Sequence, residues 1–289
     1  MRKFWVGFGL VAGLAFGTSA PAQAPASWTA PTAPFRIADN LYYVGTEGIS
    51  SFLITTPSGH ILIDGAMPTS AKIIEASIVK LGFKITDVKV LLNTHAHFDH
   101  TGGLAELKRD TGAKMAASAA DTPALESGTY PGAEEVKAFN FAPVKVDRAL
   151  KDGDTVRLGG AVLTANVTPG HTAGCTTWTF PVTVAGVRRQ ALVYCSTSVA
   201  ANRLVSKARG PQYPGIVENY RRTFVRLKAI KADIFLAPHA EQFGLAEKRA
   251  KLAAGGANPF VDPTELARAV SQSEADFNRD LARQQAAAK

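Results

Sequence analysis

The sequence predicts an α+β fold of four layers, an αβ/βα sandwich in which two packed β-sheets are covered by helices on both outer faces. Three observations support this prediction. Apolar stretches of strand length come in blocks, segments with apolar residues at helical spacing fall between the blocks, and the blocks divide into two halves at about residue 150. Since each sheet must bury one face, this order favours two sheets packed against each other with the helices outside.

The first half begins with a β-meander and continues with helices between strands. Its expected strands cover residues 42–44, 51–55, 61–64 and 88–92, and its expected helices cover 70–81 and 104–111. The first of these helices shows apolar side chains at helical spacing, including Ile74 and Ile78, and it stops before Gly82. The segment 88–92 is almost wholly apolar and leads directly into a cluster of histidines.

The second half repeats the mixture of strands and helices. Its expected strands cover residues 145–146, 155–158, 161–168, 175–184, 190–195 and 233–236, and its expected helices cover 217–230 and 263–289. The last helix carries Leu266, Val270, Phe277 and Leu281 at helical spacing. We expect that apolar face to pack against the core rather than to bind a partner protein, and we expect no obligatory protein partner.

The first residues have the organisation of a secretory signal peptide. A basic start, Arg2-Lys3, precedes an apolar run over 4–16 and small residues ending in Ala24. We therefore expect residues 1–24 to be removed, residues 25–34 to form a flexible arm rich in Pro and Ala, and residues 35–289 to form one domain. The mature protein is expected in the periplasm or outside the cell, with no membrane attachment.

The charge pattern excludes one class of partner. The formal net charge is +8 at pH 7, but the basic residues are spread along the chain without a dense stripe or an aromatic platform between them. Nucleic-acid binding is therefore not expected. A positive excess of this kind is compatible with small anionic substrates.

The histidine cluster His95-Ala96-His97-Phe98-Asp99-His100 indicates a metal site. Imidazole nitrogens and a carboxylate oxygen are the ligands that zinc prefers in open, catalytic sites. On an extended segment, residues two apart point the same way, so His95 and His97 can bind one ion together. A turn before Gly102 would direct Asp99 and His100 to a second point nearby.

Two further histidines are candidate ligands because each follows an apolar strand. His171 lies in Thr168-Pro169-Gly170-His171-Thr172, and His239 lies in Leu236-Ala237-Pro238-His239. Loops at strand ends are places where a rigid sheet positions functional groups. His60, in the turn Ser58-Gly59-His60, lacks such a context and is interpreted as an ordinary surface histidine.

With these histidines the chain resembles the metallo-β-lactamase superfamily, whose pattern is His-x-His-x-Asp-His followed by a Gly-His-Thr and a Pro-His histidine. It is most similar to the third subclass of class B β-lactamases (B3). The segments that carry the narrower resemblance are 43–48, 62–68, 105–108, 111–114 and 218–222. The resemblance covers nearly the whole chain from Trp28 and implies the metallo-β-lactamase fold.

This resemblance implies a function and a ligand set. It implies a zinc-dependent β-lactamase that hydrolyses the amide bond of β-lactam antibiotics through a metal-bound hydroxide, with antibiotic resistance as the consequence. Asp99 would be the catalytic residue that orients the nucleophile. Two Zn²⁺ ions per chain would be bound, the first by His95, His97 and His171, and the second by Asp99, His100 and His239.

The segment 193–198 distinguishes this function from others in the superfamily. Thioesterases, lactonases and nucleases of the superfamily carry a metal-bridging aspartate here, whereas this segment has no carboxylate. The resemblance implies that Ser196 and Ser198 bind the substrate and that Asn202 donates to the developing oxyanion. Hydrolysis of a lactone, an ester or a thioester is the alternative function.

The two cysteines leave three possibilities open. Cys195 could be a zinc ligand, as a cysteine near this place is in the first lactamase subclass. Cys175 and Cys195 could also form a disulfide across a hairpin, although directly opposed strand positions give poor geometry. Two free buried thiols are the third possibility.

Overall fold

Two β-sheets form the centre of the molecule. The computed structural model describes residues 24–288, so the predicted signal peptide lies outside the described residues except for Ala24. A seven-stranded sheet has the order β1-β2-β3-β4-β5-β6-β7, and a five-stranded sheet has the order β12-β11-β10-β9-β8. The first sheet ends at Leu150 and the second begins at Thr155, which confirms the predicted division of the chain. Within residues 24–288, none of the helices has the length and apolar character needed to span a bilayer.

The first sheet combines an antiparallel meander with a parallel part. Strands β1 to β4 pair antiparallel, and β4 to β7 pair parallel, so the latter need crossover connections. Two crossovers contain α1 (Ala71–Lys80) and α3 (Leu104–Thr111). The strands are β1 (Phe35–Ala38), β2 (Leu41–Tyr43), β3 (Phe52–Thr56), β4 (Gly59–Ile63), β5 (Val88–Leu92), β6 (Lys114–Ser118) and β7 (Arg148–Leu150).

The second sheet is antiparallel except for β12, which runs parallel to β11. Its strands are β8 (Thr155–Leu158), β9 (Ala161–Val167), β10 (Thr176–Val184), β11 (Val187–Val193) and β12 (Ile234–Leu236). The other helices are α2 (Phe98–Thr101), α4 (Thr122–Ser127), α5 (Ile216–Ala229), α6 (Leu245–Ala254) and α7 (Glu265–Ala287), with 3-10 turns η1 (Ala26–Trp28), η2 (Ile85–Asp87), η3 (Lys137–Phe139) and η4 (Ala240–Phe243).

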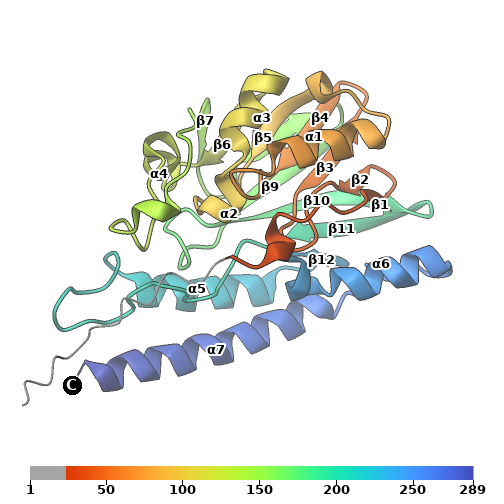
Figure 1. Cartoon of the computed structure of the whole chain (residues 1–289). Coiled ribbons are helices and arrows are strands. Elements are labelled where there is room, and N and C mark those ends of the chain that lie inside the picture. The colour runs from red at the N-terminus through yellow and green to blue at the C-terminus, as the bar shows by residue number, and fades with distance from the viewer. Residues whose placement is uncertain (1–23, 289) are drawn as a thin grey trace, which may run out of the picture.

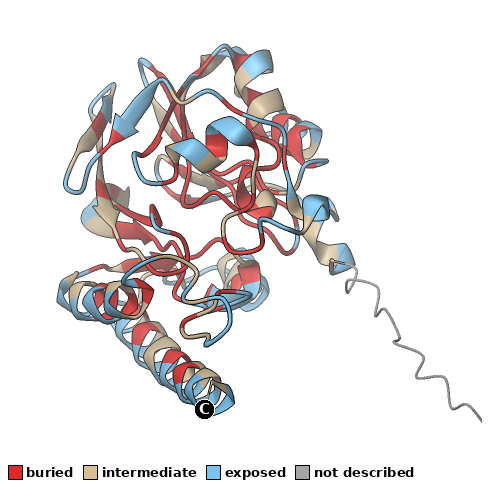
Figure 2. Ribbon diagram, turned by 90° about the vertical axis from the view of Figure 1, so that its left-hand side faces the viewer, coloured by how far each residue is buried: buried red, intermediate tan, exposed pale blue. Residues whose placement is uncertain are grey.

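The four layers are arranged as predicted. Helices α1 and α3 lie above the first sheet, and α5, α6 and α7 lie beneath the second (Figure 1). One core lies between the sheets and continues under α5 and α7, with Trp178 and Phe180 among its largest side chains. A second core lies between the first sheet and α1 and α3, and it contains Ile74 and Ile78. Buried residues accordingly concentrate along the strands (Figure 2).

The β10–β11 hairpin decides the state of the cysteines. Ala185 and Gly186 form its turn, and both have positive φ, as the two-residue turns of tight hairpins require. The register pairs Trp178 with Val193, which leaves Cys175 and Cys195 beyond the paired ladder rather than directly opposed. They form a disulfide with a Cα–Cα distance of 5.8 Å. The disulfide is thus the correct alternative, and neither a free thiol nor a Cys195 metal ligand is present.

Residues 25–34, for which the sequence predicts a flexible arm, lie against the domain. The carbonyl oxygen of Trp28 accepts a hydrogen bond of 2.9 Å from the Thr46 hydroxyl, and that of Ser27 accepts one of 2.8 Å from the Gly48 amide. The Trp28 ring also contacts the His239 ring, with centroids 5.1 Å apart. These contacts place the segment beside the strand-end loops.

Candidate metal centre

The loop after β5 carries four of the six predicted ligands. His95 and His97 lie on its extended part, and the single-turn helix α2 begins at Phe98. The chain therefore turns before Gly102, as the sequence predicts, and Asp99 and His100 point to a different place from His95 and His97. Gly102 and Gly103 permit the close approach of this turn to neighbouring backbone, since a Cβ on either would lie 2.3–2.4 Å from it.

The structure brings all six predicted side chains into two groups. The first ligand group consists of His95, His97 and His171, and the second ligand group consists of Asp99, His100 and His239. Within each group the candidate ligand atoms lie within 4.8 Å of one another. All six residues line one cavity of about 460 Å³. These groups are capable of binding metal.

Hydrogen bonds orient the imidazole rings of the first ligand group. His97 Nε2 lies 3.0 Å from the Pro131 carbonyl oxygen, and His171 Nδ1 lies 2.7 Å from that of Ser198. Each bond fixes one nitrogen as a donor and leaves the other as an acceptor for a metal. His95 Nε2 is buried and has no hydrogen-bond partner among residues 24–288. Because buried polar atoms are almost always paired, this orphaned nitrogen fits a metal ligand.

The protonation states of these side chains also fit the binding of a metal. Burial lowers the pKa of His95 and of His97 well below the usual value, and it lowers the pKa of His171 to about 4. These imidazoles are therefore neutral, which is the form that binds a metal. Burial alone would raise the pKa of Asp99, but the neighbouring His100 and His239 hold it well below its usual value. Asp99 is thus an anion between two imidazoles.

Asp64 is a supporting residue to which the sequence analysis assigned no role. Its Oδ1 accepts hydrogen bonds from the Asn93 side chain (3.1 Å) and the Thr94 amide (2.7 Å), and its Oδ2 accepts one from the Thr94 hydroxyl (2.7 Å). These bonds hold the loop just before His95. The available signal was its position as the last residue of the expected strand 61–64, a charged side chain at the end of an apolar run.

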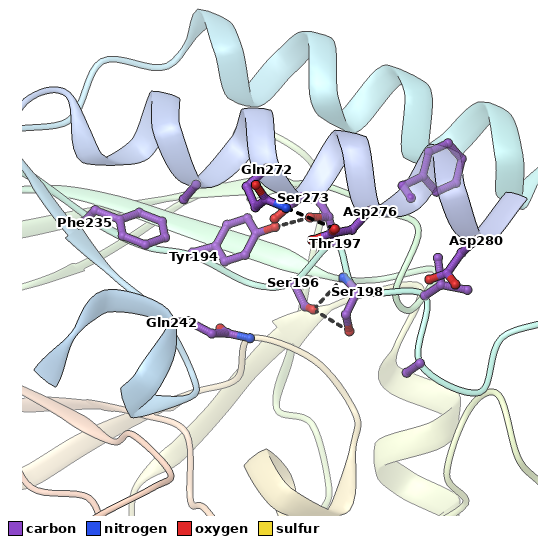
Figure 3. A pocket seen from close by; sticks show the side chains of 14 residues that line it. Tyr194, Ser196, Thr197, Ser198, Phe235, Gln242, Gln272, Ser273, Asp276 and Asp280 are labelled. Carbon is purple, nitrogen blue, oxygen red and sulfur yellow. Dashed lines mark hydrogen bonds between the residues drawn. The ribbon is translucent and has the colours of Figure 1, made fainter.

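The serine segment 196–198 lies at the edge of the cavity. Ser196 and Ser198 both line it, with their hydroxyl oxygens 3.3 Å apart, and the Ser198 amide donates to Ser196 Oγ. Figure 3 shows a neighbouring pocket that Ser196 and Ser198 also line; in it these two side chains lie between Gln242 and α7, while Thr197 lies beside Tyr194. A polar substrate group in the cavity can therefore reach both serine hydroxyls.

Asn202 does not line the cavity, contrary to its predicted contact with substrate. Its side-chain amide donates to the His171 carbonyl oxygen at 2.8 Å, and Gln284 of α7 donates to the Asn202 carbonyl oxygen at 3.0 Å. The chain turns at Ala200, which has positive φ, so Asn202 is buried and directed inward. Asn202 supports His171 instead.

His60 is also placed differently from the sequence interpretation. It is buried rather than at the surface, and its ring packs edge-on against Phe83 with centroids 4.9 Å apart. The reason is that His60 belongs to β4, every residue of which is buried between β3 and β5. His60 has no place among the lining residues of the metal cavity.

An aromatic wall closes one side of the cavity, and sequence analysis did not find it. The Tyr130 ring stacks on His97 with centroids 4.0 Å apart, and Phe139 stacks on Phe98 at 5.4 Å. Both Tyr130 and Phe139 line the cavity, with Trp28 from the N-terminal segment. They come from the long connection between α4 and β7, which has no periodic pattern to reveal its path.

The two-sheet sandwich, with two groups of candidate metal ligands on its strand-end loops, places the protein in the class of α+β proteins that are capable of binding metal. The sequence profile of the metallo-beta-lactamase superfamily matches residues 44–184. The chain belongs to this superfamily, as its histidine pattern predicts.

Solved structures show to which subclass of this superfamily the chain is similar. BJP-1, a subclass B3 metallo-beta-lactamase of Bradyrhizobium japonicum, is 50% identical, with a TM-score of 0.88 over 91% of this chain and 99% of that chain. The FEZ-1 metallo-beta-lactamase from Legionella gormanii is 42% identical, with a TM-score of 0.84 over 89% of this chain and 98% of that chain. The predicted similarity to the third subclass is confirmed.

Curated relatives match a shorter segment. A hydroxyacylglutathione hydrolase of Hyphomonas neptunium is 37% identical over 106 residues, which are 37% of this chain and 33% of that protein. The chain matches about a third of the length of the first such relatives.

Proposed function

We propose that this protein is a zinc-dependent β-lactamase that hydrolyses the amide bond of β-lactam antibiotics. One observation carries the proposal: the first and second ligand groups meet in a single cavity, in a chain 50% identical to a subclass B3 metallo-beta-lactamase over 99% of that chain. Antibiotic resistance is the proposed physiological consequence.

Each ligand group would hold one zinc ion. Three protein ligands leave an open coordination position, as in catalytic zinc sites, whereas structural sites are closed by four. When bound, two zinc ions supply Lewis acidity and a water of lowered pKa at neutral pH. The neutral imidazoles of the first ligand group and the anionic Asp99 of the second are already in the protonation states that such binding needs.

The residues of the chain bind and orient the substrate. Asp99 Oδ2 lies 3.2 Å from His100 Nε2 and 3.4 Å from His239 Nε2, and these two imidazoles keep the carboxylate ionised. As an anion in the cavity, Asp99 would accept a hydrogen bond from the nucleophile and orient it. The hydroxyl of Ser198 would donate to the substrate carboxylate, and that of Ser196 would contact the water of the site. Asn202 would act indirectly, because it holds the backbone of His171.

Thioester hydrolysis is the second candidate function, because the curated relatives are hydroxyacylglutathione hydrolases. It is the weaker candidate. Those relatives match over about a third of their length, and the segment 193–198 has no carboxylate to bridge two metal ions. The cavity of about 460 Å³ suits a small molecule in either case.

We also propose that residues 1–24 direct the protein to the periplasm or outside the cell. The Cys175–Cys195 disulfide supports this location, because disulfides persist in oxidising compartments and are rare in the cytosol.

A substrate panel tests the function. Purified protein is assayed with nitrocefin and a carbapenem, beside a lactone and a thioester, before and after treatment with a chelator. The proposal predicts lactam hydrolysis that the chelator abolishes and zinc restores. Turnover confined to the thioester would support the second candidate. Turnover confined to the lactone, or zinc binding without turnover of any substrate, would reject both.

A further inference from the structure

Asp121 is a buried carboxylate with no part in the proposed chemistry. It occupies the N-cap position of α4, where an aspartate ordinarily accepts a hydrogen bond from the first turn of the helix. Its side chain makes no such bond. The residue is only 4% exposed, and burying a charged group is costly unless it is hydrogen-bonded elsewhere.

The Asp121 carboxylate connects two loops that are far apart in the sequence. Its Oδ2 accepts hydrogen bonds from the Ala96 amide at 3.1 Å and from the Thr172 hydroxyl at 2.8 Å. Its Oδ1 accepts one from the Gly174 amide at 2.7 Å. Ala96 lies between His95 and His97, and Thr172 follows His171 directly, so two of the three bonds are made next to members of the first ligand group and together adjoin all three.

The close fit at Gly174 supports this role. A Cβ at this position would lie 2.5–2.6 Å from the Asp121 backbone nitrogen, Cγ and Oδ1. A glycine is therefore required for the carboxylate to reach the Gly174 amide at all. The bonds also need an acceptor at both oxygens, because all three partners face Asp121 as donors. An asparagine has one acceptor oxygen, and its NH₂ group would face the amide of Ala96 or of Gly174.

We infer that Asp121 is a positioning residue that holds the two loops of the first ligand group in the geometry of one metal ion. Its side-chain hydrogen bonds reach no member of the second ligand group. Loss of the Asp121 carboxylate should therefore weaken the binding of one ion much more than the other. This inference rests on the metal binding in the proposed function, and it is independent of the substrate.

Zinc titration of the metal-free protein against a chromophoric chelator tests the inference. The unsubstituted protein should bind two ions. Asp121→Asn should bind one of them about 10- to 100-fold more weakly, the usual effect of removing a group that orients metal ligands, and leave the affinity for the other nearly unchanged. Thermal unfolding of each metal-free variant is measured in parallel, so that a loss of affinity is separated from a loss of stability.

Asp147→Asn is the matched control. Asp121 lies just after the end of β6, whereas Asp147 lies beside the first residues of that strand. Asp147 accepts hydrogen bonds from the Met115 amide at 2.8 Å and from Lys108 at 2.6 Å, and neither bond involves the histidine loops. This variant should lose stability but keep both zinc affinities. Equal losses of affinity in Asp121→Asn and Asp147→Asn would overturn the inference, as would unchanged affinities in Asp121→Asn.

Thr172→Val decides the question if Asp121→Asn does not fold. It removes one of the three donors at nearly constant volume, and it should weaken the binding of the same ion, though less than Asp121→Asn does. Thr172→Ser should restore the affinity. Unchanged zinc affinity in Thr172→Val would then refute the positioning role. If the unsubstituted protein binds no zinc, the proposed function itself fails, which is a different and recognisable result.

Discussion

Removing the Cys175–Cys195 disulfide should lower the free energy of unfolding by about 3 kcal/mol. The disulfide joins residues 20 apart in the sequence. For a loop of this length, the chain-entropy relation gives about 11 cal/mol/K, or roughly 3.3 kcal/mol at 25 °C, through restriction of the unfolded chain. Both cysteines are fully buried, so replacing either with alanine also removes a packed sulfur atom, which costs on the order of 1 kcal/mol.

A double-mutant cycle separates these two effects. Cys175→Ala and Cys195→Ala each break the disulfide, so each single variant should lose about 4 kcal/mol and the double variant about 5 kcal/mol. The resulting coupling of about 3 kcal/mol is measured by urea unfolding of the metal-free proteins without a reducing agent. Additive losses, with a coupling below about 1 kcal/mol, would show that the disulfide does not stabilise through loop closure.

Three further predictions concern single side chains. Ser198→Ala should raise the KM for a β-lactam about 10-fold or more with little change in kcat, because a hydrogen bond to a charged group contributes about 1.5–3 kcal/mol. A fall in kcat at constant KM would contradict this role of Ser198. Asn202→Ala should cost about 1–3 kcal/mol in urea unfolding, because the His171 carbonyl oxygen loses its donor, and a loss confined to KM would instead favour a substrate contact. Arg268 and Thr264 hold the pKa of Asp262 well below its usual value, so the ionised Asp262 stabilises the fold fully above about pH 4. This stabilisation is lost as the pH falls below about 4, and the difference in free energy of unfolding between the unsubstituted protein and Asp262→Asn should shrink with it.

The placement of the six candidate ligand residues was predictable because it depends on local rules. Side chains two apart on a strand extension share a direction, which paired His95 with His97. A single helical turn then redirected Asp99 and His100. His171 and His239 each follow an apolar strand, and strand ends of neighbouring sheets carry their loops to a common edge.

The supporting residues were not predictable in the same way because distant contacts decide their directions. Asn202 points inward to the His171 carbonyl oxygen, and Gln284 of α7, some eighty residues later, holds its backbone. His60 is buried because β4 pairs with β5, and its local sequence indicates only a turn. The aromatic wall of Tyr130 and Phe139 lies on a long connection without periodicity, so nothing in that segment predicts which face meets the cavity.

The two ligand groups differ in how much of their geometry the chain itself determines. Every imidazole of the first ligand group has a hydrogen-bonded ring nitrogen, and Asp121 joins its two loops by accepting from the Ala96 and Gly174 amides. In the second ligand group, the polar partners of the histidine rings are Asp99, itself a member of the group, and the exposed Glu241 at 3.7 Å from His239 Nδ1. His100 Nδ1 is buried without a hydrogen-bond partner among residues 24–288, so it fits a metal ligand as His95 Nε2 does. Asp99 is the group that both of these histidines face, so their orientation depends on its charge. The first ligand group is therefore pre-organised by the protein, whereas the second would gain much of its order from the ion it binds.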